Sequence, residues 1–204
     1  MFPEESLMRR CNRIIKRTLD LIGSSIGLVF FPLVLIPVAV AIKIDSRGPV
    51  FYRQLRTGRN GRLFTCYKFR TMSVDADENP VRRSDPRVTR VGRFLRRTSI
   101  DELPQLINVF LGQMSLVGPR PHIPTHTLFY GSIIPRYNER LAVKPGITGW
   151  AQVNGYRGST DRMWKMERRI EHDLWYIAHQ SLRFDLRILL RTFILQLTGD
   201  KNAY

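Results

Sequence analysis

The chain has 204 residues and a formal net charge of +16, from 33 Lys and Arg residues against 17 Asp and Glu residues. Since 43% of the residues are hydrophobic, the chain can bury a core, which excludes an intrinsically disordered protein. Cys11 and Cys66 are its only cysteines, which excludes a disulfide scaffold. The excess positive charge fits three kinds of anionic partner: nucleic acid, a membrane surface or a phosphorylated substrate.

The N-terminal region contains an apolar run from Leu21 to Ile42, 22 residues without a formal charge. As a helix rising ~1.5 Å per residue, this run is about 33 Å long and can cross the hydrocarbon core of a bilayer. Pro32 and Pro37 interrupt it, and prolines inside a helix remove hydrogen bonds and cause kinks. A buried core helix fits less well, because the run is long for a soluble domain.

Basic residues flank both ends of this run. They are Arg9, Arg10, Arg13, Lys16 and Arg17 before it, and Lys43, Arg47, Arg53, Arg56, Arg59 and Arg62 after it. Positive charge is typical of cytoplasmic loops, and a single span should have it at one end only. The pattern favours a re-entrant segment that enters the cytoplasmic leaflet, turns near Pro32 and leaves on the same side, with a kinked single span as the alternative. The flanking charges are expected to face anionic lipid headgroups.

A small hairpin and several helices are predicted after Asp45. The Asn60-Gly61 step favours a tight turn between strands at Val50–Tyr52 and Leu63–Phe69. Residues 73–86 form a polar stretch that predicts a loop. Apolar periodicity predicts helices over residues 88–97, 102–111, 163–177 and 184–197. The last of these either lies in the membrane interface or packs against the core.

An adjacent acidic pair, Asp101-Glu102, stands where the helix over residues 102–111 should begin. Either Ser99 or Asp101 fits as its N-cap residue, and in both cases the helix dipole favours ionised carboxylates there. By itself such a pair most often caps a helix.

The acidic pair is surrounded in sequence by basic residues at loop or element-end positions, where binding residues concentrate. They are Lys68, Arg70, Arg120 and Arg157. Arginine forks bind phosphates, and Mg²⁺ held by a carboxylate neutralises charge during phosphoryl transfer. A carboxylate can also attack phosphorus to give an acyl phosphate. Because the sequence has no P-loop, GxGxxG motif or metal-type Cys/His cluster, the pair is the best candidate for chemistry on a pyrophosphate.

Four segments resemble, in the same order, motifs of the bacterial sugar transferases, the monotopic phosphoglycosyl transferases that begin glycan assembly on a polyprenyl phosphate. The segments are Tyr67–Met72, Arg96–Leu106, Ser115–Pro121 and Lys144–Gly155. The resemblance extends from about Lys16 to Leu197. It is to the minimal catalytic form, without the multi-helix N-terminal membrane region of larger members.

The resemblance implies an α+β fold in two parts. Residues 1–45 would form an amphipathic start and a re-entrant membrane helix broken near Pro32. Residues 46–204 would form a catalytic domain with a small β-hairpin or sheet and several amphipathic helices, at the cytoplasmic face of the bacterial inner membrane. The implied reaction moves a sugar 1-phosphate from a UDP-sugar to undecaprenyl phosphate and releases UMP. It would use Mg²⁺ and a covalent aspartyl-phosphosugar intermediate.

The resemblance also implies roles for single residues. Asp101 matches the family's nucleophile, and Glu102 matches the carboxylate that serves the metal. Contacts to phosphate or uridine are assigned as a group to Lys68, Arg96, Arg120, Arg157 and Asp173. Two positions depart from the family pattern. Phe31-Pro32 stands where members often have Ser-Pro, and Gln113 stands where Asp is common, so position 113 receives no catalytic role.

The segment Asn154–Thr160 resembles members that prime exopolysaccharides with hexose 1-phosphate, which favours glucose or galactose without separating the two. One alternative is the same chemistry with an N-acetylated amino-sugar donor. A remote alternative is a basic, membrane-tethered nucleic-acid-binding protein. Nucleic acid is not expected as a partner, because the sequence lacks a helix-turn-helix, RNA-recognition or zinc-finger signature. These patterns assign no oligomeric state.

Overall fold

The structure is a computed structural model that describes residues 7–74, 85–158 and 162–198. Its helices are α1 (Leu7–Asp45), α2 (Arg90–Thr98), α3 (Gln105–Phe110), α4 (Pro124–Ile133), α5 (Met163–Ala178) and α6 (Leu182–Thr198). Its strands are β1 (Phe51–Thr57), β2 (Leu63–Phe69), β3 (Ser115–Val117) and β4 (Gly146–Thr148). This mixture of helices and small sheets confirms the predicted α+β class.

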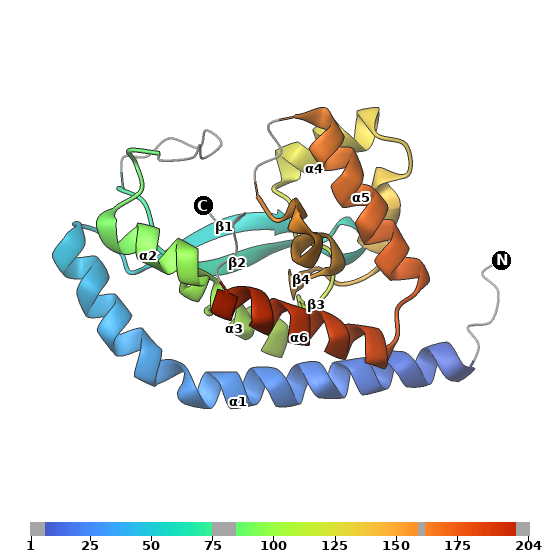
Figure 1. The fold of residues 1–204 in the computed structure, drawn as a ribbon, viewed down its shortest axis with the longest axis horizontal. Helices are drawn as coiled ribbons and strands as arrows, with labels where there is room; N and C mark the ends of the chain where they lie inside the picture. The colour runs from blue at the N-terminus through green and yellow to red at the C-terminus, as the bar shows by residue number, and fades with distance from the viewer. Residues whose placement is uncertain (1–6, 75–84, 159–161, 199–204) are drawn as a thin grey trace.

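The helix α1 runs along one side of the molecule and is bent (Figure 1). It is helical from Leu7 to Asp45 and includes Pro32 and Pro37, so the break expected near Pro32 takes the form of a bend within one helix. The rest of the domain lies on the concave side of this bend (Figure 1).

Much of the surface of α1 is apolar and exposed. Near the prolines, Val29, Phe30 and Leu33 are 73%, 60% and 73% exposed. The helix is long and apolar enough to cross a membrane, yet only 11% of its apolar stretch is buried inside the domain. Since a core helix would bury this surface, the exposed side chains mark α1 as a candidate membrane segment.

Charged side chains tie the N-terminal half of α1 to the domain. Lys16 Nζ donates to the Val117 carbonyl at 2.9 Å and pairs with Asp185 Oδ2 at 2.7 Å. Arg17 donates to the last two carbonyls of α3 at 2.7 and 2.8 Å. These two cations, which are expected to face lipid headgroups, also bond to the domain: carbonyl groups at the ends of β3 and α3 and the Asp185 carboxylate accept their hydrogen bonds.

Two small sheets lie at the centre of the molecule (Figure 1). In the antiparallel β1–β2 hairpin, Phe51 lies opposite Phe69. Asn60 and Gly61 have φ angles of 55° and 76°, the left-handed conformation that a tight hairpin turn requires, which confirms that predicted turn. The second sheet, parallel β3–β4, was not predicted, because strands of three residues give no periodic signal.

The C-terminal helices agree closely with their predicted ranges. In α6, Phe184 and Ile188 are buried in the core, whereas Leu190 and Phe193 are exposed. Both predicted placements of this helix therefore describe part of it: one face packs inside and the other presents an apolar surface. Of the predicted loop over residues 73–86, residues 75–84 lie outside the described residues.

Candidate active site

The acidic pair lies in a single 3₁₀ turn, Ile100–Glu102, between α2 and α3. Ser99 has φ 57° and ends α2, and its side chain caps no helix. Pro104, and not an acidic residue, precedes α3. Both predicted capping arrangements are therefore wrong, because the amide of Glu102 bonds to the Ser99 carbonyl at 3.1 Å and the chain turns once before α3 begins. The two carboxylates are thus available for other contacts.

Three cations surround the carboxylate of Glu102. Lys68 Nζ lies 2.7 Å from Oε1, Arg120 Nη2 lies 2.8 Å from Oε1, and Arg157 Nη2 lies 3.4 Å from Oε2. Glu102 itself is only 4% exposed. Burial alone would raise the pKa of Glu102, but attraction to Arg120, Lys68 and Arg157 outweighs it and holds that pKa well below its usual range.

Asp101 is in a different position, although it is the next residue. It is 7% exposed, and within the described ranges no hydrogen bond or ion pair holds its carboxylate. Burial raises the pKa of Asp101, and the charge of Glu102 raises it further, against weaker opposing effects of Lys68 and Arg96. The turn therefore places a firmly ionised carboxylate beside one that is unpaired and less stable as an anion.

A buried polar cluster lies behind these residues. Arg140 Nε and Nη2 both donate to Asp173 Oδ2, at 2.9 and 2.8 Å, and Nη2 also donates to the Arg120 carbonyl at 2.6 Å. The His122 ring lies beside Arg140 and bonds to Tyr137 Oη at 2.6 Å. Burial, together with Arg140 and Arg169, holds the pKa of His122 well below its usual range, which keeps the ring neutral.

Arg169 extends this cluster to the second arginine loop. Its Nε donates to the Tyr156 carbonyl at 2.9 Å, and its Nη2 donates to the Gly158 carbonyl at 2.6 Å. These two carbonyls bracket Arg157. Arg140 and Arg169 therefore fix the backbone at Arg120 and around Arg157, the two loops whose arginines contact Glu102.

The structure brings together some of the residues that the sequence assigned to the site. Lys68, Arg120 and Arg157 meet at Glu102. Arg96 donates to Thr71 Oγ1 at 2.8 Å and is close enough to act electrostatically on Asp101.

The remaining assigned residues lie elsewhere. Arg70 points to the C-terminal end of α1, where it donates to the carbonyls of Ser46 and Arg47. Asp173 is buried and forms an ion pair with Arg140. Within the described ranges it forms no ion pair with Lys68, Arg120 or Arg157, and its link to the site passes through Arg140, which donates to the Arg120 carbonyl. Sequence reasoning missed Arg140, Arg169 and His122, because no local spacing links them to residues 101–102.

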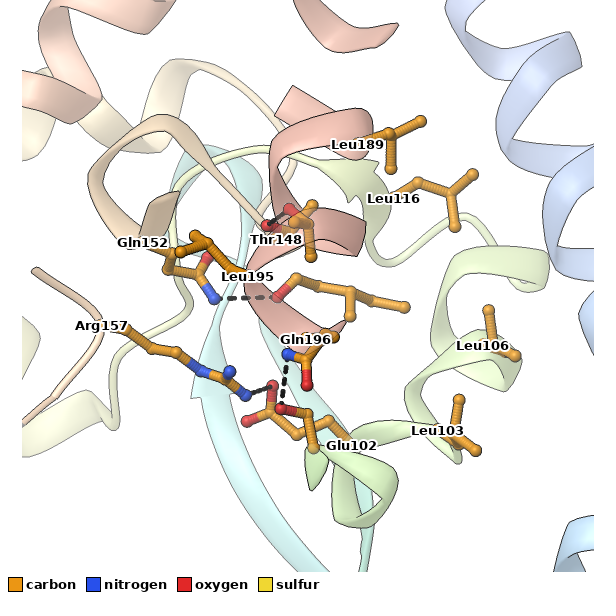
Figure 2. Close-up of a pocket in the computed structure, with 13 residues that line it drawn as sticks. Glu102, Leu103, Leu106, Leu116, Thr148, Gln152, Arg157, Leu189, Leu195 and Gln196 are labelled. Atoms are coloured by element: carbon orange, nitrogen blue, oxygen red, sulfur yellow. Dashed lines mark hydrogen bonds and ion pairs between the residues drawn. The ribbon is translucent and has the colours of Figure 1, made fainter. Parts of the chain in front are cut away.

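A cavity of about 210 Å³ opens beside Glu102 and Arg157 (Figure 2). Its other walls are mostly apolar and include Leu103, Leu106, Leu116, Ile147, Leu189 and Leu195. Figure 2 shows the acidic and basic groups on one side of this cavity, with several leucines on the side toward α1. The cavity therefore changes from polar to apolar along its length.

The carboxylate expected to serve Mg²⁺ is that of Glu102, which three cations hold in this structure. Among the described residues, no group of three or more His, Cys, Asp or Glu side chains could hold a metal ion. Mg²⁺ commonly needs only one or two carboxylates, because water and substrate phosphates complete its octahedron. The family motif assigns this carboxylate role to Glu102.

Residues 11–199 match the family described as bacterial sugar transferase. The chain therefore belongs to the bacterial sugar transferase family, which confirms the resemblance seen in its motifs.

Named relatives agree with this assignment. The chain is 50% identical to UDP-glucose:undecaprenyl-phosphate glucose-1-phosphate transferase of Escherichia coli (strain K12), over 95% of this chain and 42% of the relative. It is 44% identical to an exopolysaccharide production protein of Rhizobium leguminosarum bv. phaseoli, over 93% of this chain and 98% of the relative. It is 42% identical to UDP-N-acetylgalactosamine-undecaprenyl-phosphate N-acetylgalactosaminephosphotransferase of Aeromonas hydrophila, over 91% of this chain and 44% of the relative. The chain spans less than half the length of the first and third of these relatives.

Proposed function

We propose that the chain transfers a hexose 1-phosphate, with glucose favoured, from a UDP-sugar to undecaprenyl phosphate. This would be the first membrane step in the synthesis of an exopolysaccharide or a related glycan. The observation that carries the proposal is the contrast within one turn: three cations hold Glu102, while Asp101 is buried beside them with no ion pair to the described residues. Such a site attracts a pyrophosphate and leaves one carboxylate oxygen free to attack it.

The chemistry consists of two displacements at one phosphorus. In the first, an Asp101 oxygen attacks the phosphorus that bears the sugar, the pyrophosphate P–O bond breaks, and UMP leaves with the electron pair. The product is an acyl phosphate that joins Asp101 to the sugar. In the second, a phosphate oxygen of the acceptor attacks the same phosphorus and the bond to Asp101 breaks. The Asp101 carboxylate is thereby restored.

The basic residues stabilise the charge that develops in both steps. Arg120 and Arg157 present guanidinium groups next to Asp101, and a planar guanidinium can bind two phosphate oxygens at once. Lys68 adds a compact charge from the end of β2. Mg²⁺ held at Glu102 would neutralise charge on the pyrophosphate and on the leaving UMP.

The bent helix α1 supports a place at the membrane. The domain lies on the concave side of the bend, so both ends of α1 can lie on the same side of its exposed apolar surface as α2 and α3 (Figure 1), the helices that flank the acidic pair. A re-entrant helix in the cytoplasmic leaflet of the bacterial inner membrane has this arrangement, and it brings the site within reach of a lipid-linked phosphate.

The donor sugar can be tested directly. Full-length protein in detergent is mixed with undecaprenyl phosphate, Mg²⁺ and one UDP-sugar at a time, and UMP release is measured. UDP-glucose is expected to give the fastest release. Faster release with UDP-N-acetylgalactosamine would instead place the chain with its relative from Aeromonas hydrophila. If no donor gave UMP in the presence of acceptor, the proposal would be wrong.

A further inference from the structure

The cavity beside Glu102 has an apolar side that the two displacement steps do not use. Six apolar residues, Leu103, Leu106, Leu116, Ile147, Leu189 and Leu195, line it, and they come from α3, β3, β4, α6 and the loop before α3. A sugar or a nucleotide has few surfaces that would need such a wall. An amphipathic ligand fits it better, since a charged head can lie at Glu102 and Arg157 while its apolar part lies among the leucines.

The apolar side of the cavity is also the side nearest α1. Gly23 and Gly27 of α1 lie directly against Leu116 and Leu106, because a Cβ atom on either glycine would come within 2.7 Å of a leucine Cδ1. Figure 2 shows α1 beyond these two leucines. The two leucines thus separate the cavity from the helix that the proposed function places in the membrane.

The polar end of the cavity contains an unused hydrogen-bond acceptor. Gln152 is 6% exposed, and its Nε2 donates to the Ile147 carbonyl at 3.0 Å. Its Oε1 has no hydrogen-bond partner in the described part of the chain, and the residue lines the cavity. A buried amide oxygen without a partner is costly, which indicates that water donates to it, because neither a phosphate dianion nor a hydrocarbon chain carries a hydrogen-bond donor.

From the apolar wall and its contact with α1 we propose that the cavity binds the apolar chain of the acceptor next to its phosphate, with that chain lying along the leucines that pack against α1. This inference rests on the proposed function and extends it. The phosphate lies at the cations around Glu102, where the phosphosugar on Asp101 awaits it. The apolar wall acts only on the second displacement, because the UDP-sugar brings no apolar chain.

The two half-reactions separate this inference from the proposed function. UMP released from UDP-glucose without acceptor reports the first displacement, and turnover with undecaprenyl phosphate reports the second. Leu195→Trp fills the cavity from α6, and Leu190→Trp is the matched control, since Leu190 lies on the same helix and is 60% exposed. Leu195→Ala removes apolar surface at the same place without adding bulk.

We expect Leu195→Trp to keep the UMP burst within about twofold of the wild type and to raise the KM for undecaprenyl phosphate by about tenfold or more. Leu195→Ala should raise the same KM by a smaller factor, and Leu190→Trp should leave it unchanged. An unchanged acceptor KM in both Leu195 variants would overturn the inference while leaving the proposed function intact. A UMP burst lost in both variants would also overturn it, since the cavity would then serve the donor. Absence of a burst from the wild type would refute the proposed function itself.

Discussion

Two adjacent carboxylates have opposite properties because different groups surround them. Glu102 is held by Lys68, Arg120 and Arg157, and its pKa is well below the usual range. Asp101 is buried without such partners, and its pKa is raised. A pair of carboxyl groups whose pKa values are pushed apart is typical of catalytic sites in which each has its own role. Here the lower pKa belongs to Glu102, which holds the cations, and the higher pKa belongs to Asp101, the group proposed to attack.

Replacing Glu102 by glutamine should destabilise the protein. The substitution leaves three neighbouring cations without their shared anion, and we expect the free energy of unfolding to fall by about 2 kcal/mol at neutral pH. This loss is smaller than the loss from breaking a fully buried ion pair, because the cations retain contact with water. Because the folded-state pKa of Glu102 is lowered, its stabilising effect is present above the ordinary glutamate pKa and is lost as the pH falls through the lowered value. Urea unfolding at several pH values measures this. Glu139→Gln, in an exposed ion pair with Arg136, is the control and should change little.

Replacing Asp101 by asparagine should have the opposite effect on stability. Because the folded-state pKa of Asp101 is raised, this group leaves the folded protein most stable below the ordinary aspartate pKa, where the carboxyl is protonated. That contribution to stability is lost as the pH rises through the raised value. A neutral asparagine should therefore raise the melting temperature at pH 7 by a few degrees, and the gain should shrink in acid. Thermal melts of the two proteins across this pH range measure the difference. A lower melting temperature at pH 7 would show that the ionised carboxylate stabilises the fold.

At the scale of elements, the site depends on two loops fixed from behind. Arg140 bonds to the Arg120 carbonyl, and Arg169 bonds to the carbonyls of Tyr156 and Gly158 on either side of Arg157. The helix α5 supplies both Arg169 and Asp173, so this one helix positions the two arginine loops over the acidic pair. Arg140 and Asp173 are therefore positioning residues.

The double variant Arg140→Met with Asp173→Leu tests this positioning role. It removes both charges of a buried pair, a change that is often neutral or even stabilising, so the protein should fold. The Arg120 loop would lose its hydrogen-bond donor. We expect the rate constant of the UMP burst to fall by about tenfold or more, with a smaller change in the donor concentration that gives half of the maximal rate. The control is Arg136→Lys on the surface. A folded double variant with an unchanged rate constant for the burst would show that the Arg140–Asp173 pair is only structural.

Local sequence patterns predict the elements of this protein better than they predict its contacts. The Asn60-Gly61 turn and the range of α5 follow from turn chemistry and periodicity. The family motifs place Lys68, Arg120 and Arg157 in the site, but their convergence on the carboxylate of Glu102 is seen only in the fold. The placement of Arg70 does not, because its guanidinium binds carbonyls at the end of α1, a contact 23 residues away that no local pattern encodes. For the same reason, the Arg140–Asp173 pair, 33 residues apart, became visible only in the fold.

For the molecule as a whole, the bend in α1 decides how the site meets the membrane. The exposed apolar surface around Val29, Phe30 and Leu33 lies near the two prolines, at a distance from both ends of the helix. If this surface enters the bilayer at its deepest point, both ends of α1 stay on the side of the catalytic domain. A straight span would place the two ends on opposite sides.

Cysteine labelling distinguishes these two topologies. Single cysteines are introduced in a Cys11→Ser background, in which the remaining natural cysteine, Cys66, is buried. Asn12→Cys and Arg47→Cys report on the two ends of α1, and Ser132→Cys on the exposed surface of α4 marks the side of the catalytic domain. A membrane-impermeant maleimide should label all three positions from the cytoplasmic side of vesicles. Labelling of positions 12 and 47 from opposite sides would contradict the re-entrant arrangement.

The central claim is that Asp101 forms a covalent bond to the phosphosugar, and intact-mass measurement tests it most directly. The full-length protein is mixed with UDP-glucose and Mg²⁺ without acceptor and is quenched before mass spectrometry. We expect the added mass of one phosphohexose on the wild type, its loss when undecaprenyl phosphate is added, and no adduct on Asp101→Asn. A wild type that turns over without ever carrying the adduct, or an Asp101→Asn variant that turns over normally, would contradict this claim.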